Sequence, residues 1–135
     1  MSGEILFINN KSRQLYYAKQ AVQAFLTCLK DNCLIGLKNL LWFDINLIDR
    51  ITNQEIYGKP YVLEYFDTGF NDYRSLSIID IKLAVLPKNK PALVIRSRSK
   101  TNHPIKELFV FTIIEHKIIE IERSNSFPRD IIIAE

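Results

Sequence analysis

Apolar residues recur at helical spacing in two stretches of the first third of the chain. Over residues 14–30 they repeat at intervals of three and four, and over 33–41 leucines repeat in a similar way. The members are Leu15, Ala18, Val22, Phe25 and Leu29 in the first stretch and Leu34, Leu37, Leu40 and Leu41 in the second. Because Asp31 and Asn32 interrupt the pattern, it predicts two neighbouring helices joined by a short link.

The middle of the chain predicts two strands followed by a third helix. Residues 44–49 show the partial alternation of a half-buried strand, and 52–54 have the composition of a turn. The second strand is expected to end at Gly58, because glycine adopts backbone conformations that other residues resist. Pro60 suits the first turn of a helix. The apolar residues that follow place this helix near 59–70, with Gly69 as its stop.

Alternation of apolar and polar residues dominates the second half. It predicts four strands at 75–86, 92–100, 105–115 and 118–123, joined by tight turns as an antiparallel meander. Helices first and a sheet afterwards indicate an α+β fold. We therefore expect three helices near 14–30, 33–41 and 59–70, packed on one face of a strongly bent sheet. Residues 131–133 are expected to be an exposed apolar run.

Length and composition indicate one domain whose core is large enough to be stable without disulfides or structural metal ions. We predict a domain of residues 13–125, an N-terminal arm of 1–12 and a C-terminal tail of 126–135. The apolar run at 5–8 either adds a strand or packs on a partner, and it is too short to be a signal peptide or a membrane span. A cytoplasmic location is therefore expected. Cys28 and Cys33 are predicted to be free thiols of a reducing compartment, in preference to the alternative of a disulfide or redox pair.

The order of these elements resembles a known superfamily, the nuclear-transport-factor-2-like proteins, which include SnoaL-like polyketide cyclases and ketosteroid isomerases. The resemblance covers about residues 14–124. It rests on the element order, the break at Asp31 and Asn32, the Gly58 before a helix, and a last strand entered through residues 116–119. That entry is the usual place of a Gly-Lys-Ile turn, where this sequence has His116 instead of glycine.

The resemblance implies a cone, in which the bent mixed or antiparallel sheet wraps the helices around a blind and mostly apolar pocket. It implies that a small apolar molecule is a possible ligand. It also implies a homodimer through the outer face of the sheet. We expect residues 131–133 or the run at 5–8 to help cover apolar surface in that dimer.

Asp49 is the first candidate for chemistry, because it ends the first predicted strand. The resemblance places it where ketosteroid isomerases, whose carboxylates are tuned by an apolar site, have their general-base aspartate. A carboxylate at a dry cavity mouth can have a raised pKa and accept a proton. The alternative is a structural role, in which Asp49 caps a turn with Arg50 or with the backbone of Thr52.

The remaining catalytic groups of such an isomerase are replaced by aromatic residues. Phe25, Phe109 and Phe66 stand where the resemblance implies a tyrosine, a protonated aspartate and a second tyrosine. Phenylalanine cannot donate a hydrogen bond to a developing oxyanion, so the sequence argues against steroid isomerisation. The aromatic set forms either a filled core or an apolar ligand pocket. The full set of expected ligand-binding residues is Phe25, Trp42, Asp49, Tyr65, Phe66, Arg96, Phe109 and Phe111.

A basic segment has three interpretations. Residues 81–106 contain seven Lys or Arg and no Asp or Glu, and Arg96, Arg98 and Lys100 alternate on one strand face. They form a solvated face, a stripe for anions or nucleic acid, or a site in which Arg96 enters the cone and pairs with a carboxylate ligand or with Asp49. No aromatic residue interleaves with them, which argues against nucleic acid.

Other kinds of site find no support in the sequence. Neither histidine has a cysteine or a second histidine at metal-ligand spacing, so no metal and no cofactor are predicted. Two functions of different classes remain. The first is a small-molecule-binding or protein-interaction module with an apolar pocket. The second is a SnoaL-like enzyme of the cyclase or isomerase type, with Asp49 as general base.

Overall fold

The computed structural model describes the backbone of residues 3–31, 33–74, 77–98, 101 and 103–133. Side chains are described for 16–29, 31, 33–68, 80, 82–88, 90–98, 101 and 103–133. The described helices are α1 (Gly3–Asp31), α2 (Leu34–Leu40), α3 (Lys59–Arg74) and a 3-10 turn, η1 (Pro87–Asn89). The strands are β1 (Leu41–Asp49), β2 (Gln54–Tyr57), β3 (Ser77–Leu86), β4 (Lys90–Arg98), β5 (Pro104–Ile114), β6 (Lys117–Ser124) and β7 (Ile132–Ile133).

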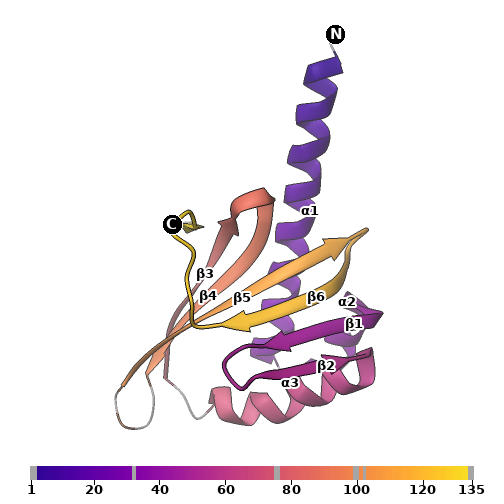
Figure 1. Ribbon diagram of the computed structural model, residues 1–135. Coiled ribbons are helices and arrows are strands. Elements are labelled where there is room, and N and C mark those ends of the chain that lie inside the picture. The colour runs from indigo at the N-terminus through magenta and orange to yellow at the C-terminus, as the bar shows by residue number, and fades with distance from the viewer. Residues whose placement is uncertain (1–2, 32, 75–76, 99–100, 102, 134–135) are drawn as a thin grey trace.

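The described strands form one sheet in the order β2-β1-β6-β5-β4-β3-β7. All neighbours are antiparallel except β1 and β6, which run parallel. The sheet curves around the helices without closing, with α1 along its concave face (Figure 1). The predicted α+β fold and the four-stranded meander are therefore confirmed.

Three irregularities in strand pairing accompany the curvature. The register shifts between Leu41 and Asn46 in β1, between Ile78 and Asp80 in β3, and at Thr112 and Ile113 in β5. Bulges of this kind bend a strand and increase its local twist. They allow the strands to wrap around the helices, as the sequence predicted in outline.

Two helices are longer than the sequence predicted. Helix α1 begins at Gly3, so the segment expected to be an arm is helical, and the alternative that its apolar run adds a strand is wrong. No glycine or proline interrupts the chain between Gly3 and Gly36, which removes the usual reason for a helix to begin later. Helix α3 continues past Gly69 to Arg74, because one glycine weakens a helix by only about 1 kcal/mol.

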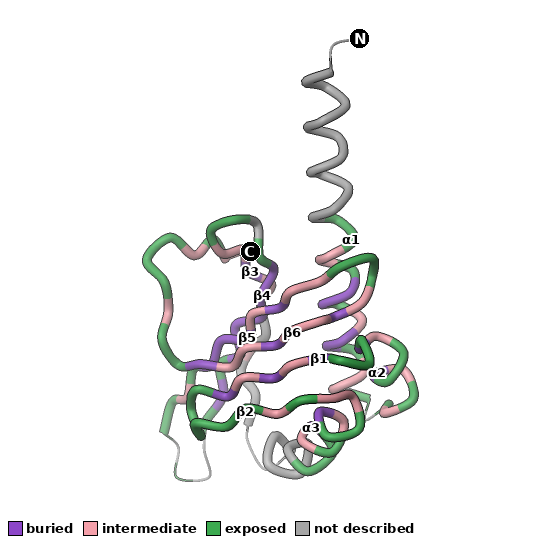
Figure 2. Tube along the Cα trace, turned by 45° about the vertical axis from the view of Figure 1, so that its right-hand side comes forward, coloured by how far each residue is buried: buried purple, intermediate pink, exposed green. Residues whose placement is uncertain are grey.

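The main core lies between the helices and the concave face of the sheet. Inward-facing residues of β1, β4, β5 and β6 pack with apolar residues of the helices in one buried cluster. The buried stretches of these strands are purple in Figure 2. Its members are Val22, Phe25, Leu26, Leu37, Leu41, Ile45, Leu47, Val62, Phe66, Leu93, Ile95, Phe109, Phe111, Ile118 and Ile121. No helix in the described part of the chain is long and apolar enough to cross a membrane.

The C-terminal tail covers part of the convex face. Strand β7 pairs with β3, and three tail residues, Phe127, Ile131 and Ile133, pack on a second buried cluster. That cluster consists of Ala84, Ala92, Val94 and Leu108. The predicted exposed run is therefore corrected: Ile131 and Ile133 are half-buried, and Ile132 between them is exposed because successive residues of a strand face opposite sides.

Candidate functional site

Asp49 is the last residue of β1 and continues its inward-facing row. Ile45 and Leu47 precede it on the same face, and all three are buried, with no exposed surface on the Asp49 side chain. A buried carboxylate must be paired or hydrogen-bonded to remain charged. The arrangement around Asp49 therefore decides what its carboxylate can do.

Four donors converge on the Asp49 carboxylate. Oδ1 accepts hydrogen bonds from the amides of Ile51 at 3.0 Å and Thr52 at 3.1 Å, which close the turn after β1. Oδ2 accepts from the Tyr65 hydroxyl at 2.6 Å and from the Arg123 guanidinium at 2.9 Å. A carboxylate has about four acceptor positions, so these donors occupy all of them.

Arg123 joins Asp49 to a second carboxylate. It lies beside Asp49 in the parallel pairing of β6 with β1. Its guanidinium also donates two hydrogen bonds to Glu107 on β5, at 2.6 and 3.2 Å. We call Asp49, Tyr65, Glu107 and Arg123 the polar cluster. It continues the concave face past its last apolar residues, at the end where β1 and β6 finish and β5 begins.

The electrostatics of the polar cluster keep Asp49 ionised. Burial by itself raises the pKa of the Asp49 carboxyl, but hydrogen bonds from Tyr65, the Thr52 backbone and Arg123 outweigh it and hold the pKa below its ordinary value. Burial and the Asp49 charge raise the pKa of the Tyr65 hydroxyl. At neutral pH the cluster therefore contains a carboxylate and a protonated phenol.

This geometry disfavours a proton-accepting role for Asp49. A general base needs an acceptor position facing the substrate and a pKa near the working pH. Asp49 has its acceptor positions occupied and a lowered pKa. Its arrangement combines the turn cap, one of the two roles considered from sequence, with an ion pair to Arg123.

Arg123 and Glu107 are functional-site neighbours of Asp49 that the sequence did not predict. Glu107 alternates with Phe109 and Phe111 on one strand face, and Arg123 follows Ile121 at the same spacing. The sequence signal for this ion pair was a negative residue on one apolar strand face and a positive residue on another. Such residues face the core unless the pattern breaks, and burial then requires them to pair.

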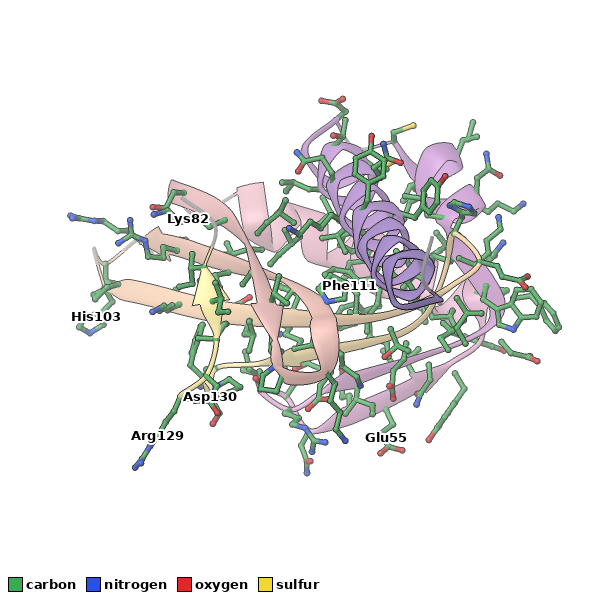
Figure 3. The ribbon with its side chains drawn as sticks, turned by 90° about the horizontal axis from the view of Figure 1, so that it is seen from above. Glu55, Lys82, His103, Phe111, Arg129 and Asp130 are labelled. Atoms are coloured by element: carbon green, nitrogen blue, oxygen red, sulfur yellow. The ribbon has the colours of Figure 1, made fainter. Side chains whose placement is uncertain are left out.

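Four predicted ligand-binding residues are packed core residues. Phe25, Phe66, Phe109 and Phe111 are each at most 2% exposed. The Phe25 ring meets those of Phe66 and Phe111 edge-on, with centroids 5.2 and 5.0 Å apart. Figure 3 shows Phe111 in the interior, between α1 and the sheet. Of the two alternatives left open by the sequence, these contacts match the filled aromatic core.

Arg96 and Trp42 lie away from the polar cluster. Ile95 and Ser97 face inward, so Arg96 between them faces outward, where it pairs with Asp80 on β3. The interpretation that Arg96 pairs with Asp49 is therefore wrong, and Arg123 has that role. Trp42 lies in the irregular part of β1 and is 43% exposed, with its ring 4.6 Å from that of Phe43.

Exposed aromatic side chains gather at the opposite end of the sheet. They come from α1, the start of β1, the end of β2 and the start of α3, and the exposed Ile114 at the end of β5 lies beside Tyr17. We call these six residues the aromatic end: Tyr17, Trp42, Phe43, Tyr57, Tyr61 and Ile114, each at least 43% exposed. A hollow of about 390 Å³ lies there between Tyr17, Ala18 and residues 113–116, beside the contact of Tyr17 with His116.

Among the residues whose side chains are described, no group of three or more His, Cys, Asp or Glu is placed to hold a metal ion. The polar cluster has two carboxylates, but Arg123 lies between them and occupies the position that a cation would take.

Comparisons with known proteins identify the fold. No protein-family model and no curated protein matches the sequence. Among solved structures, a nuclear-transport-factor-2-like protein of unknown function from Mesorhizobium loti matches with a TM-score of 0.69 and 7% identity, over 83% of this chain and 93% of that one. A candidate polyketide cyclase from Sinorhizobium meliloti matches with a TM-score of 0.61 and 13% identity, over 78% and 94%.

A third neighbour is a hypothetical protein with a ketosteroid isomerase-like fold from Catenulispora acidiphila, solved with trimethylamine. It matches with a TM-score of 0.58 and 11% identity, over 78% of this chain and 85% of that one. At these identities the matches establish architecture and not activity. The chain has the nuclear-transport-factor-2-like fold, as the sequence resemblance predicted.

Proposed function

We propose that this protein is a binding or interaction module that uses the nuclear-transport-factor-2-like fold without proton-transfer chemistry at Asp49. One observation carries the proposal: the four donors on the Asp49 carboxylate come from two backbone amides, Tyr65 and Arg123. The family's catalytic position is thereby part of the structural framework. The packed aromatic rings beside it support the same conclusion.

The alternative is a cyclase or isomerase with Asp49 as general base. Some neighbours in fold have names that suggest such activities. Asp49 would then have to release Tyr65 or Arg123 before accepting a proton, and its lowered pKa makes it a weak base. The same residues therefore favour the binding function.

A direct test is to follow exchange of an α-hydrogen for deuterium in a cyclic enone, with wild-type protein and with Asp49→Asn. We expect both proteins to match the buffer rate. Exchange above that rate, lost in Asp49→Asn while the variant stays folded by circular dichroism, would establish the enzyme and overturn the proposal.

The proposed binding surface is the aromatic end. Clusters of exposed aromatic side chains are uncommon on monomeric proteins and mark interaction sites. The hollow beside Tyr17 has a volume within the range of small-molecule sites, so an apolar molecule or an apolar side chain of a partner fits it. Native mass spectrometry of purified protein tests this function, because a small molecule held there adds a defined mass.

Tyr17→Ala sharpens that measurement, with Ile132→Ala as a matched loss of an exposed apolar side chain elsewhere. We expect a bound molecule to be lost from the first variant and kept by the second. Equal retention by both variants would place the site away from the aromatic end.

The homodimer stays part of the proposal. The tail covers the convex face over β3, β4 and β5, so the proposed interface is the part formed by β1 and β6. Sedimentation that gives a monomer at high micromolar concentration would refute the dimer.

A further inference from the structure

Two cysteines lie side by side where α1 meets α2. The Cys33 amide donates a hydrogen bond of 2.9 Å to the Cys28 carbonyl, which closes the turn between the helices. Both cysteines are free thiols, as predicted, and Cys33 is exposed while Cys28 is half-buried against the core. Residues five apart do not share a face of one helix, but this turn brings their backbones together.

The sulfur atoms of Cys28 and Cys33 both lie beside Gly36. A Cβ atom at Gly36 would lie 2.8 Å from the Cys28 Sγ and 3.2 Å from the Cys33 Sγ. The Cys33 Sγ also accepts the Gly36 amide at 3.4 Å. Gly36 lies within a helix, where glycine is less favourable than alanine by about 1 kcal/mol, and its missing side chain leaves the space that the two thiols occupy.

The two thiols also differ in environment. Burial, followed by the neighbouring Cys33 thiol, raises the pKa of the Cys28 thiol. A reagent in solution therefore meets Cys33 first, because Cys33 is exposed and Cys28 is half-buried. This is the arrangement of an attacking and a resolving cysteine.

We propose that Cys28 and Cys33 form a dithiol–disulfide pair that is oxidised by exchange with small-molecule disulfides. The Cys33 thiolate attacks a disulfide, forms a mixed disulfide and releases one thiol. Cys28 then loses its proton and attacks the Cys33 sulfur, which expels the second thiol and forms the Cys28–Cys33 bond. Two electrons pass from the pair to the reagent, which is reduced to two thiols.

Oxidation would change the junction between the helices. The Cys33 sulfur accepts the Gly36 amide at the start of α2, and Leu37 of α2 is fully buried in the core. A covalent bond to Cys28 ties this first turn to α1. The oxidation state of the pair would therefore act on the position of α2 in the core.

The test treats the folded full-length protein with oxidised glutathione and measures intact mass and free thiols over time. We expect the wild type to lose two hydrogen atoms and retain no glutathione. Cys28→Ser should keep a stable glutathione adduct on Cys33, and Cys33→Ser should react much more slowly. A wild type that accumulates the same stable adduct as Cys28→Ser would overturn the proposal.

Two controls separate geometry from mere closeness in sequence. Closure of the mixed disulfide should be at least about tenfold faster in the folded protein than in urea, because folding holds the sulfurs together. Gly36→Ala crowds both sulfurs and should slow closure while helix content stays unchanged by circular dichroism. Equal closure rates in the folded and unfolded chains would show that the fold contributes nothing.

Discussion

At one end of the sheet charged side chains face the interior, and at the other end apolar side chains are exposed. At the polar cluster, Asp49 and Glu107 are buried, and the half-buried Arg123 joins their carboxylates by hydrogen bonds of 2.6–3.2 Å. At the aromatic end, apolar rings are exposed to solvent. Buried and satisfied groups stabilise a fold, whereas exposed apolar groups are available to a partner.

This difference changes which residues are the candidates for function. A search by residue type leads to Asp49, because a carboxylate in an apolar fold suggests acid–base chemistry. Structural ion-pair networks perturb pKa values as well, and here the perturbation lowers the pKa. Exposed apolar side chains set the aromatic end apart, and the proposed binding function rests on them. The predictions that follow test each side of this contrast.

The largest effect is expected for Arg123→Met at the polar cluster. This change keeps much of the side-chain volume and leaves Asp49 and Glu107 buried without their shared cation. Removing one partner of a buried ion pair costs about 3–5 kcal/mol in the free energy of unfolding. Urea unfolding at pH 7 measures it, with the exposed Arg96→Met as the control that should change stability far less. Equal losses of stability in the two variants would show that the polar cluster contributes no more than an exposed ion pair.

A smaller loss is expected for Asp49→Asn, about 2–3 kcal/mol, because Tyr65 and Arg123 lose a charged acceptor while the shape is kept. The loss should depend on pH in a definite direction. The pKa of Asp49 is lowered in the folded state, so its charge stabilises the fold fully above the unfolded value of 3.8. That stabilisation disappears as pH falls through the lower folded value.

Unfolding of the wild type and of Asp49→Asn at several pH values between neutral and strongly acidic checks the sign. The gap between the two proteins should be constant near neutral pH and shrink below about pH 4. A gap that widens in acid would mean that Asp49 has a raised pKa in the fold, which would restore the general-base interpretation.

The hydroxyl of Tyr65 has a more limited role. Tyr65→Phe removes one of four donors to Asp49 and leaves the ring contact with Phe66 in place, with centroids 5.1 Å apart. We expect a loss of about 1–2 kcal/mol, on the scale of one hydrogen bond to a charged group. In the Asp49→Asn background the same change should cost less, and a double-mutant cycle measures that coupling. Full additivity would show that the two side chains act independently.

Local pattern predicted the elements and the face of each strand, because burial alternates with a period of two. It placed Phe109 and Phe111 on one strand face; the structure has both on the concave face, together with Asp49, which the resemblance placed at the pocket. It could not find the partner of Asp49, because Arg123 follows it by 74 positions and meets it through the β1–β6 pairing. The parallel pairing of these two strands depends on the whole sheet and has no local signal.

The aromatic end was missed for a related reason. Trp42, Tyr57 and Tyr61 lie in three different elements, and each is of a residue type that is often found in a protein core. Trp42 and Phe43 are consecutive and both exposed, which strand alternation forbids unless pairing is irregular. The shift of register between Leu41 and Asn46 supplies that irregularity, and it is a property of the paired strands.

The smallest change in stability is expected at the aromatic end, where it accompanies the largest change in binding. Trp42→Ala removes a side chain that is 43% exposed, lies beside the Phe43 ring and is outside the main core cluster, so it should alter the free energy of unfolding by about 0.5 kcal/mol or less. Truncation of an aromatic residue at a binding surface commonly costs more than about 1 kcal/mol of binding free energy. Because Trp42 is the single tryptophan, its fluorescence reports occupation of this end directly in the wild type. Binding of any molecule or partner identified by mass should therefore change that fluorescence and weaken in Trp42→Ala. Binding that leaves the fluorescence unchanged and survives the substitution would place the interaction elsewhere, and a large loss of stability in Trp42→Ala would assign Trp42 to the core.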